Sequence, residues 1–100
     1  MKRTVLAEAE IAARLGSLPG WSVEQGALHR EYRFADFSEA FGFMTRAALA
    51  AEKLDHHPDW SNSYSRVVVS LSTHDAGGIT ELDVTLAREM ETLFRVAARP

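Results

Sequence analysis

The sequence predicts an α+β fold with the element order αββαββα, in which three helices pack on one face of a four-stranded antiparallel sheet. Three observations lead to this fold class. Apolar residues recur at helical spacing near both ends and in the middle of the chain. Other stretches alternate apolar and polar residues, as half-buried strands do. Turns containing Gly and Pro separate these segments, and this grouping favours an antiparallel sheet with its helices on one side.

The first helix is expected over residues 5–15. Thr4 is its candidate N-cap, and Glu8 and Glu10 lie near its start, where the helix dipole favours acidic side chains. Gly16 follows the last helical residue and is suited to end the helix.

Two strands are expected next, over residues 21–24 and 27–34, with Gln25 and Gly26 at the hairpin tip. Alternate residues of a strand point to the same face. In the second strand one such set comprises Leu28, Arg30, Tyr32 and Phe34. The aromatic residues mark this face as the core side, with Arg30 near its edge.

The second helix has the clearest helical pattern in the chain. Its expected core stripe recurs at spacings of four and three residues and comprises Phe37, Phe41, Met44, Ala48 and Ala51. Asp36 or Ser38 would cap its start. Because Pro58 disfavours helical geometry in the residue before it, the helix must end by residues 55–57.

The C-terminal half completes the element order. A short strand is expected near residues 60–62, and a longer one over residues 65–74 has Val67, Val69 and Leu71 on one face. We expect the β-branched part of this longer strand, residues 66–73, to lie at a sheet edge. Thr80 followed by Asp83 is a capping-box pattern that opens a third helix, to about Val96. The apolar stripe of that helix comprises Leu82, Leu86, Met90, Leu93 and Ala97.

The composition narrows the class of protein. One hundred residues, 46% of them hydrophobic, suit a single domain over residues 1–100. The net charge of -3 disfavours a nucleic-acid partner, and no apolar run is long enough to span a membrane. There is no cysteine, and the N-terminus turns acidic where a signal peptide would stay apolar. We therefore expect a cytoplasmic protein.

Three of the four histidines lie in two short segments: His56 and His57 precede Pro58, and His74 ends a predicted strand. Imidazole gives and takes protons near neutral pH, with an ordinary pKa of ~6.5. A single loop histidine is more often simply solvated, but two in succession before a rigid proline favour a chemical role. The set suits a reaction that removes one proton and delivers another. His29 lies in mid-strand and is assigned no role.

Two acids, Glu52 and Asp83, could support these histidines, and a metal site is the competing interpretation. Glu52 lies on the last turn of the second helix, against the helix dipole, so it is expected to have a partner or a function. Helix capping alone would explain Asp83, although a capping carboxylate can also orient an imidazole. Three histidines and a carboxylate match the ligands of zinc. However, His-x-x-x-His is absent and adjacent histidines seldom converge on one ion, so no metal is expected.

Several sequence runs resemble one known family. They are EKLDHHP at 52–58, STH at 72–74 and TELD at 80–83, with Tyr64, Gly78 and Leu86-Ala87. Together they resemble the pterin-4a-carbinolamine dehydratases. Upstream, Gly20-Trp21, Asp36-Phe37 and FGFMTR at 41–46 extend the likeness, which covers roughly residues 18–97. The separation of the HHP and TH runs is highly specific.

The resemblance implies an αββαββα enzyme that forms homodimers or homotetramers. Its substrate would be a 4a-hydroxytetrahydropterin, the spent cofactor of aromatic amino-acid hydroxylases, and its products a quinonoid dihydropterin and water. Paired general acid–base catalysis would suffice, without a metal, nucleotide or other cofactor. Some animal members also stabilise a dimeric homeodomain transcription factor, so a protein-interaction module remains the alternative function.

The resemblance also implies roles for individual residues. His56, His57 and His74 match the catalytic histidines of the family, and Glu52 and Asp83 match acids around the site. The segments that would contact the pterin comprise Asp55, His56, His57, Ser72, Thr73, His74 and Asp75.

Overall fold

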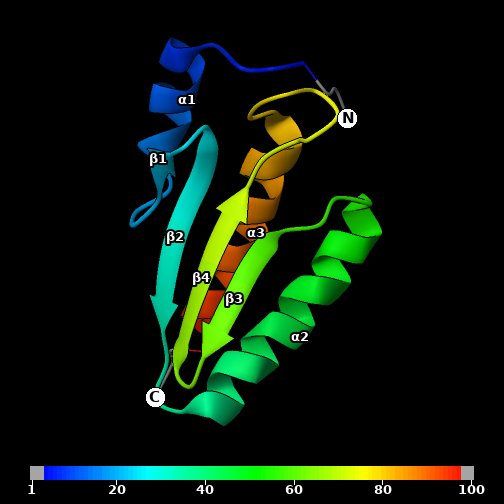
Figure 1. Cartoon of the computed structure of the whole chain (residues 1–100). Coiled ribbons are helices and arrows are strands. Elements are labelled where there is room, and N and C mark those ends of the chain that lie inside the picture. The colour runs from blue at the N-terminus through cyan, green and yellow to red at the C-terminus, as the bar shows by residue number, and fades with distance from the viewer. Residues whose placement is uncertain (1–3, 98–100) are drawn as a thin grey trace.

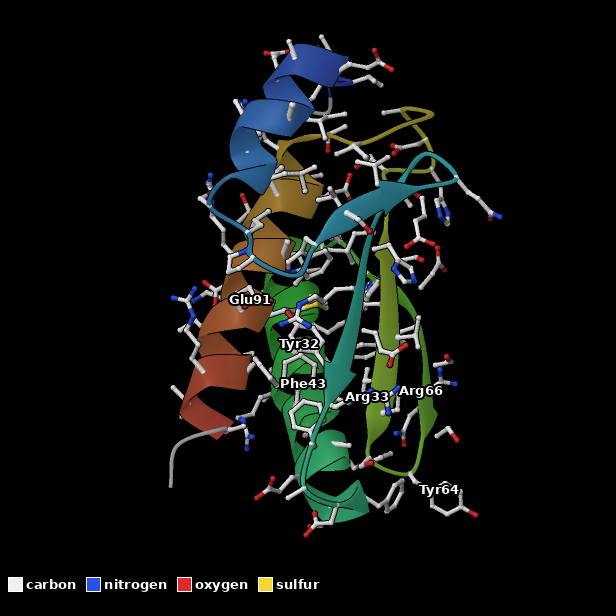
Figure 2. The ribbon with its side chains drawn as sticks, turned by 90° about the vertical axis from the view of Figure 1, so that its left-hand side faces the viewer. Tyr32, Arg33, Phe43, Tyr64, Arg66 and Glu91 are labelled. Carbon is white, nitrogen blue, oxygen red and sulfur yellow. The ribbon has the colours of Figure 1, made fainter. Side chains whose placement is uncertain are left out.

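In the computed structural model, which describes residues 4–97, three helices and a four-stranded antiparallel sheet follow the predicted αββαββα order (Figure 1). The helices lie on one side of the sheet, as the side view shows (Figure 2). The elements are α1 (Glu8–Leu15), β1 (Ser22–Glu24), β2 (Ala27–Arg33), α2 (Phe37–Leu54), β3 (Asp59–Ser63), β4 (Arg66–Leu71) and α3 (Glu81–Ala97). The predicted fold class is therefore confirmed.

The strand order is β1-β2-β4-β3. This order makes one prediction wrong, because residues 66–73 do not lie at a sheet edge: β4 pairs with β2 on one side and with β3 on the other. The short strand that follows the proline forms the edge instead. At the tip of the β1–β2 hairpin, Gln25 and Gly26 have φ values of 52° and 76°, the left-handed pair that a tight two-residue turn requires.

Helix α1 begins three residues later than predicted, and Thr4 is not its N-cap. The backbone N–H of Leu6 donates to the carbonyl of Ile79 at 2.8 Å, which holds the entering chain in an extended form. Ala7 is still extended, with ψ at 158°. This tertiary pairing outweighs the local helical pattern. Helix α1 ends at Leu15 as predicted, and Gly16 follows it in a right-handed conformation.

Helix α2 buries only part of the predicted stripe: Ala51 is buried and Met44 packs against the core, but Phe37, Phe41 and Ala48 are exposed. Its buried residues are Ala40, Phe43, Ala47 and Ala51, whereas Phe37 and Phe41 are 53% and 54% exposed. Apolar residues surround most of this helix, so spacing alone allowed two orientations. The alanines decide between them, because small side chains let the backbone approach the sheet closely while Phe43 fills the core. Asp36 caps the helix by accepting from the backbone N–H of Glu39 at 2.8 Å.

The core lies between the sheet and helices α2 and α3. The predicted inward faces of β2 and β4 are confirmed, with Leu28, Tyr32, Val67, Val69 and Leu71 all buried. The ring of Tyr32 contacts that of Phe43 with a centroid distance of 4.8 Å (Figure 2). It contacts the ring of Phe94 at the same centroid distance. Within residues 4–97, no helix is long and apolar enough to cross a membrane.

A buried carboxylate completes the core. Oε1 of Glu91, on α3, accepts hydrogen bonds from Trp21 Nε1 at 2.9 Å, Arg30 Nε at 3.0 Å and the Tyr32 hydroxyl at 2.7 Å. These donors explain how an acid can be buried in a small domain. Burial, together with the Glu91 carboxylate, raises the pKa of the Tyr32 hydroxyl well above its ordinary value.

Candidate active site

Two loops that lie at the same end of the β3–β4 pair form a cavity. Helix α2 ends at Leu54, and its C-cap residue Asp55, with a φ of 52°, turns the chain into the His-His-Pro segment that leads to β3. Strand β4 ends at Leu71 and continues into the second loop, where Thr73 pairs with Gly78. Because β3 and β4 are antiparallel, the start of one lies beside the end of the other.

The cavity has a volume of about 340 Å³, at the small end of the range for ligand sites. Its lining comprises Asp55, His56, His57, Pro58, Asp59, Ser72, Thr73, His74 and Asp75. All seven residues that the sequence suggested for pterin contact are in this lining, and so are the three candidate catalytic histidines. Glu52 and Asp83 are not in the lining, but each contacts one of these histidines.

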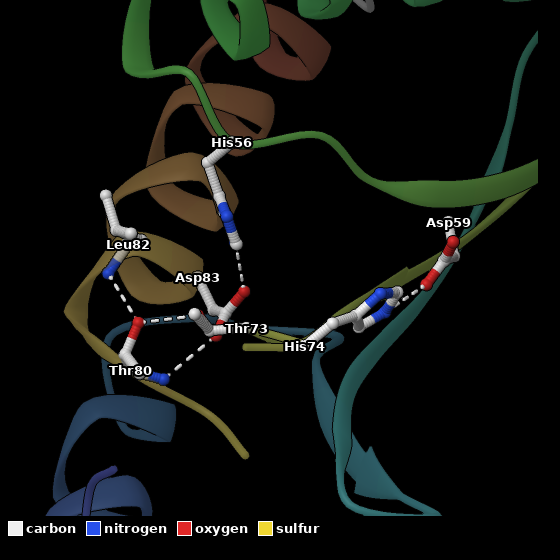
Figure 3. Close-up of polar contacts among 7 residues, drawn as sticks. All are labelled: His56, Asp59, Thr73, His74, Thr80, Leu82 and Asp83. Carbon is white, nitrogen blue, oxygen red and sulfur yellow. Dashed lines mark hydrogen bonds and ion pairs between the residues drawn. The ribbon is translucent and has the colours of Figure 1, made fainter. Parts of the chain in front are cut away.

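The imidazole of His56 contacts the buried carboxylate of Asp83. Nε2 of His56 lies 2.5 Å from Oδ1 of Asp83, and both side chains are buried (Figure 3). The other oxygen of Asp83 accepts from the Thr73 hydroxyl at 2.9 Å and from the backbone N–H of Thr80 at 2.8 Å. An ionised carboxylate can only accept, so Nε2 of His56 is the donor.

The same carboxylate also caps α3. The backbone N–H of Thr80 donates to Asp83, which is one half of the predicted capping box, while the Thr80 hydroxyl accepts from the N–H of Leu82 at 3.2 Å, one residue before the position that the box predicts (Figure 3). A second contact joins the hydroxyls of Thr73 and Thr80 at 2.7 Å. Asp83 therefore ties the start of a helix to an imidazole in the cavity wall.

The other two cavity histidines are exposed, and each has its own acid. Nε2 of His57 lies 2.6 Å from Oε1 of Glu52, which gives this acid at the end of α2 a partner. Nε2 of His74 lies 3.0 Å from Oδ2 of Asp59 (Figure 3). His74 is on the loop that follows β4 and Asp59 is the first residue of β3, so their contact joins the two segments that form the cavity wall.

Asp59 is the site residue that sequence reasoning missed. It follows the His-His-Pro run directly, at the start of β3, and the loop that holds His74 leaves the end of β4. A sheet pairing of these two strands would have placed the two residues at one end of the hairpin. His29 lies elsewhere: its Nδ1 is 2.9 Å from Oε2 of Glu24, and it does not line the cavity.

This arrangement is suited to proton transfer. Three imidazoles line one cavity, and each contacts a carboxylate that orients its ring. Among residues 4–97, no group of three or more His, Cys, Asp or Glu residues is placed to hold a metal ion. Each imidazole faces its own acid instead of a shared centre.

Known proteins share both the sequence and the fold. Residues 4–93 match the family described as Pterin 4 alpha carbinolamine dehydratase. A protein of that name from Solibacter usitatus is 54% identical over 90 residues, which are 90% of this chain and 95% of the relative. One from Rhizobium johnstonii is also 54% identical, over 99% of this chain and 97% of the relative.

A solved structure agrees with these relatives. The crystal structure of a transcriptional coactivator/pterin dehydratase from Brucella melitensis superposes with a TM-score of 0.88 at 50% identity, and the match covers 90% of this chain and 98% of that one. The chain belongs to the pterin-4-alpha-carbinolamine dehydratase family.

Proposed function

We propose that this chain is a dehydratase that converts a 4a-hydroxytetrahydropterin into a quinonoid dihydropterin and water, and so returns the pterin cofactor of aromatic amino-acid hydroxylases to use. Family membership supports the reaction class. The observation that carries the proposal is the single cavity in which three imidazoles, each with a carboxylate partner, line the walls.

The reaction needs two proton transfers. Ring nitrogen N5 loses its proton, and its electron pair forms a double bond to C4a. The bond from C4a to the hydroxyl oxygen breaks, and the oxygen takes a proton and leaves as water. A positioned base and a positioned acid each accelerate such a step by roughly 10²–10⁴-fold.

The geometry favours different roles for the three histidines. His57 and His74 come from opposite loops and are exposed, so a substrate between the loops would meet both. We assign the proton exchange to this pair. His56 is buried and fixed by Asp83, so it is suited to hold the substrate by a hydrogen bond while the other two exchange protons.

Orientation and binding would come from the remaining residues around the cavity. Glu52 orients His57 as Asp83 orients His56. The loops would contact the pterin through polar side chains and backbone groups of Asp55, Ser72, Thr73 and Asp75, which line the cavity with the histidines.

The test is turnover of a 4a-hydroxytetrahydropterin by single variants. We expect His57→Ala and His74→Ala each to lower kcat at least tenfold, because each removes one proton-transfer group. The double variant should lose less than the product of the two effects if they act as one unit. His29→Ala is the matched control, since it removes an imidazole that contacts an acid outside the cavity.

Circular dichroism and urea unfolding establish that the variants remain folded. Wild-type turnover in both single variants would contradict the proposal, and so would an equal loss in His29→Ala.

We also propose that the reaction needs no metal ion. Each cavity imidazole contacts its own carboxylate, and the geometry does not bring the three together around one centre. Dialysis against a strong chelator should leave kcat unchanged, with no zinc found by elemental analysis. A loss of activity that added zinc restores would overturn this statement.

A second function has its own supporting observation. The Brucella relative is described as a coactivator as well as a dehydratase, and α2 of this chain exposes Phe37, Phe41 and Leu49. A module that stabilises a partner's dimer would use such a surface. Pull-down from the native host, run beside the dehydration assay, separates the two: a stoichiometric partner with no dehydration would favour the module.

A further inference from the structure

Asp59 is an acid in the cavity wall that neither caps a helix nor packs in the core. It stands at the first position of β3, 64% of its side chain is exposed, and its Oδ2 lies 3.0 Å from Nε2 of His74. Both residues line the same cavity. The partners of the other two cavity histidines, Asp83 and Glu52, both come from helices, whereas Asp59 comes from the start of strand β3 (Figure 3).

We propose that Asp59 is a positioning residue for His74: its carboxylate accepts from Nε2–H and fixes the ring, so that Nδ1 is the nitrogen that exchanges a proton with the substrate. This inference rests on the proposed dehydratase function. It follows from the acceptor-only character of a carboxylate, because a bond to Nε2 requires the proton to be on that nitrogen in the neutral ring. The nitrogen left over is the one free to accept.

Substrate binding strengthens this pair. In the empty cavity both side chains face water, where an ion pair or hydrogen bond contributes little. A ring that fills a cavity of about 340 Å³ displaces water beside both side chains, and electrostatic interactions grow stronger as the local dielectric falls. The contact between Asp59 and His74 is therefore stronger in the substrate complex than in the free enzyme. Its loss should lower kcat more than it changes KM.

The experiment compares three variants. Asp59→Ala removes the acceptor and should lower kcat by roughly fivefold, with KM changed less than twofold. Asp59→Asn keeps an oxygen that can accept from Nε2–H, so it should restore most of the lost kcat. Glu24→Gln alters the corresponding acid beside His29, on the β1–β2 hairpin and outside the lining of the cavity, and should leave kcat unchanged.

A spectroscopic readout follows the hydrogen bond itself. The ring nitrogens of a ¹⁵N-labelled protein report their protonation and hydrogen bonding. The Nε2 signal of His74, recorded with a stable pterin bound, should move in Asp59→Ala and largely return in Asp59→Asn. In Glu24→Gln the signals of His29 should move while those of His74 stay.

Three results would overturn the inference: wild-type kcat in Asp59→Ala, a change confined to KM, or an Asp59→Asn variant as slow as Asp59→Ala. The last would mean that the charge matters and the orientation does not. If the wild-type protein dehydrates no pterin, the proposed function fails, whereas the His74 signal still shows whether Asp59 holds the ring.

Discussion

The carboxylate of Asp83 contacts three neighbours at once. One oxygen contacts His56 and the other accepts from Thr73 and Thr80, so the carboxylate that starts α3 also fixes a wall of the cavity. These three hydrogen-bond donors replace the water that the carboxylate loses when it is buried. Folding of this corner and orientation of the imidazole therefore depend on the same side chain.

Replacement of Asp83 by Asn should cost stability. An amide has one acceptor oxygen where the carboxylate has two, so at least one buried donor loses its partner. Leaving a buried polar group unpaired costs about 1–3 kcal/mol, and we expect a loss of about 2 kcal/mol in urea unfolding at neutral pH.

Glu52→Gln is the control for Asp83→Asn, because it alters an exposed acid beside an exposed histidine. Pairs of that kind contribute ~0–1 kcal/mol. Equal stability losses in the two variants would contradict the role given to burial.

At this scale the sequence predicted residues whose signal is local. Thr80 and Asp83 lie three apart in the sequence, and the capping contact from the Thr80 N–H to the Asp83 carboxylate needs only the start of one helix. The contact of Asp83 with His56 spans 27 positions and depends on how α2 and α3 pack. The burial of Glu91 was missed for the same reason. Its donors Trp21, Arg30 and Tyr32 lie about 60 to 70 positions away in the sequence and meet it only in the folded chain.

Helix α3 joins the cavity to the far side of the core. Asp83 and Glu91 are both buried on it, eight residues apart, which is slightly more than two turns and puts them on nearly the same face. One holds the cavity histidine and the other holds the first hairpin. The helix thus connects the two hairpins through two buried acids.

The contact between Glu91 and Tyr32 leads us to expect that the protein loses stability at alkaline pH. Burial and the Glu91 carboxylate raise the pKa of Tyr32, whereas an unfolded tyrosine ionises near pH ~10. Above that pH the unfolded chain releases a proton that the folded chain retains, so the free energy of unfolding falls as pH rises. The slope from this one group is about 1.4 kcal/mol per pH unit.

Urea unfolding between pH 8.5 and 11 measures this effect. Tyr32→Phe should show a shallower fall than the wild type, even though its stability at neutral pH is lower. Tyr64→Phe removes the hydroxyl of a residue that is 83% exposed and should keep the wild-type slope. The same slope in all three proteins would rule out the contribution of Tyr32.

The buried face of a helix or strand was predictable where its apolar residues fit only one orientation. The alternation in β2 and β4 fixed their buried faces, because a strand has only two faces and one is plainly apolar. In α2 the apolar residues fit two orientations, and contact with the sheet decided between them. The start of α1 depended on the pairing of Leu6 with Ile79, which no local signal contains.

For the molecule as a whole, the outer face of α2 is the largest unexplained feature. Phe37, Phe41 and Leu49 are 53%, 54% and 68% exposed, and the two phenylalanine rings contact each other with a centroid distance of 5.6 Å. A chain of 11.1 kDa has little spare core with which to offset such exposure. Contiguous exposed apolar surface is typical of an interaction site.

We propose that this face joins copies of the chain into a homodimer or homotetramer. Strand β4, which the sequence placed at a sheet edge, is covered by β2 and β3 and offers no edge to another copy, and the free edge of β3 is short, with the sequence DWSNS. The helix face therefore carries the prediction, and a self-complementary patch on a helix suits two-fold symmetry.

Light scattering at micromolar concentration should give a mass of two or four times 11.1 kDa. Phe41→Glu should lower that mass, because a charge buried without a partner in an apolar interface costs more than the contact supplies. Val96→Glu, at a site 57% exposed on α3, should leave the mass unchanged. A wild-type mass equal to one chain would refute the interface, and Phe37, Phe41 and Leu49 would then be open to a different protein partner.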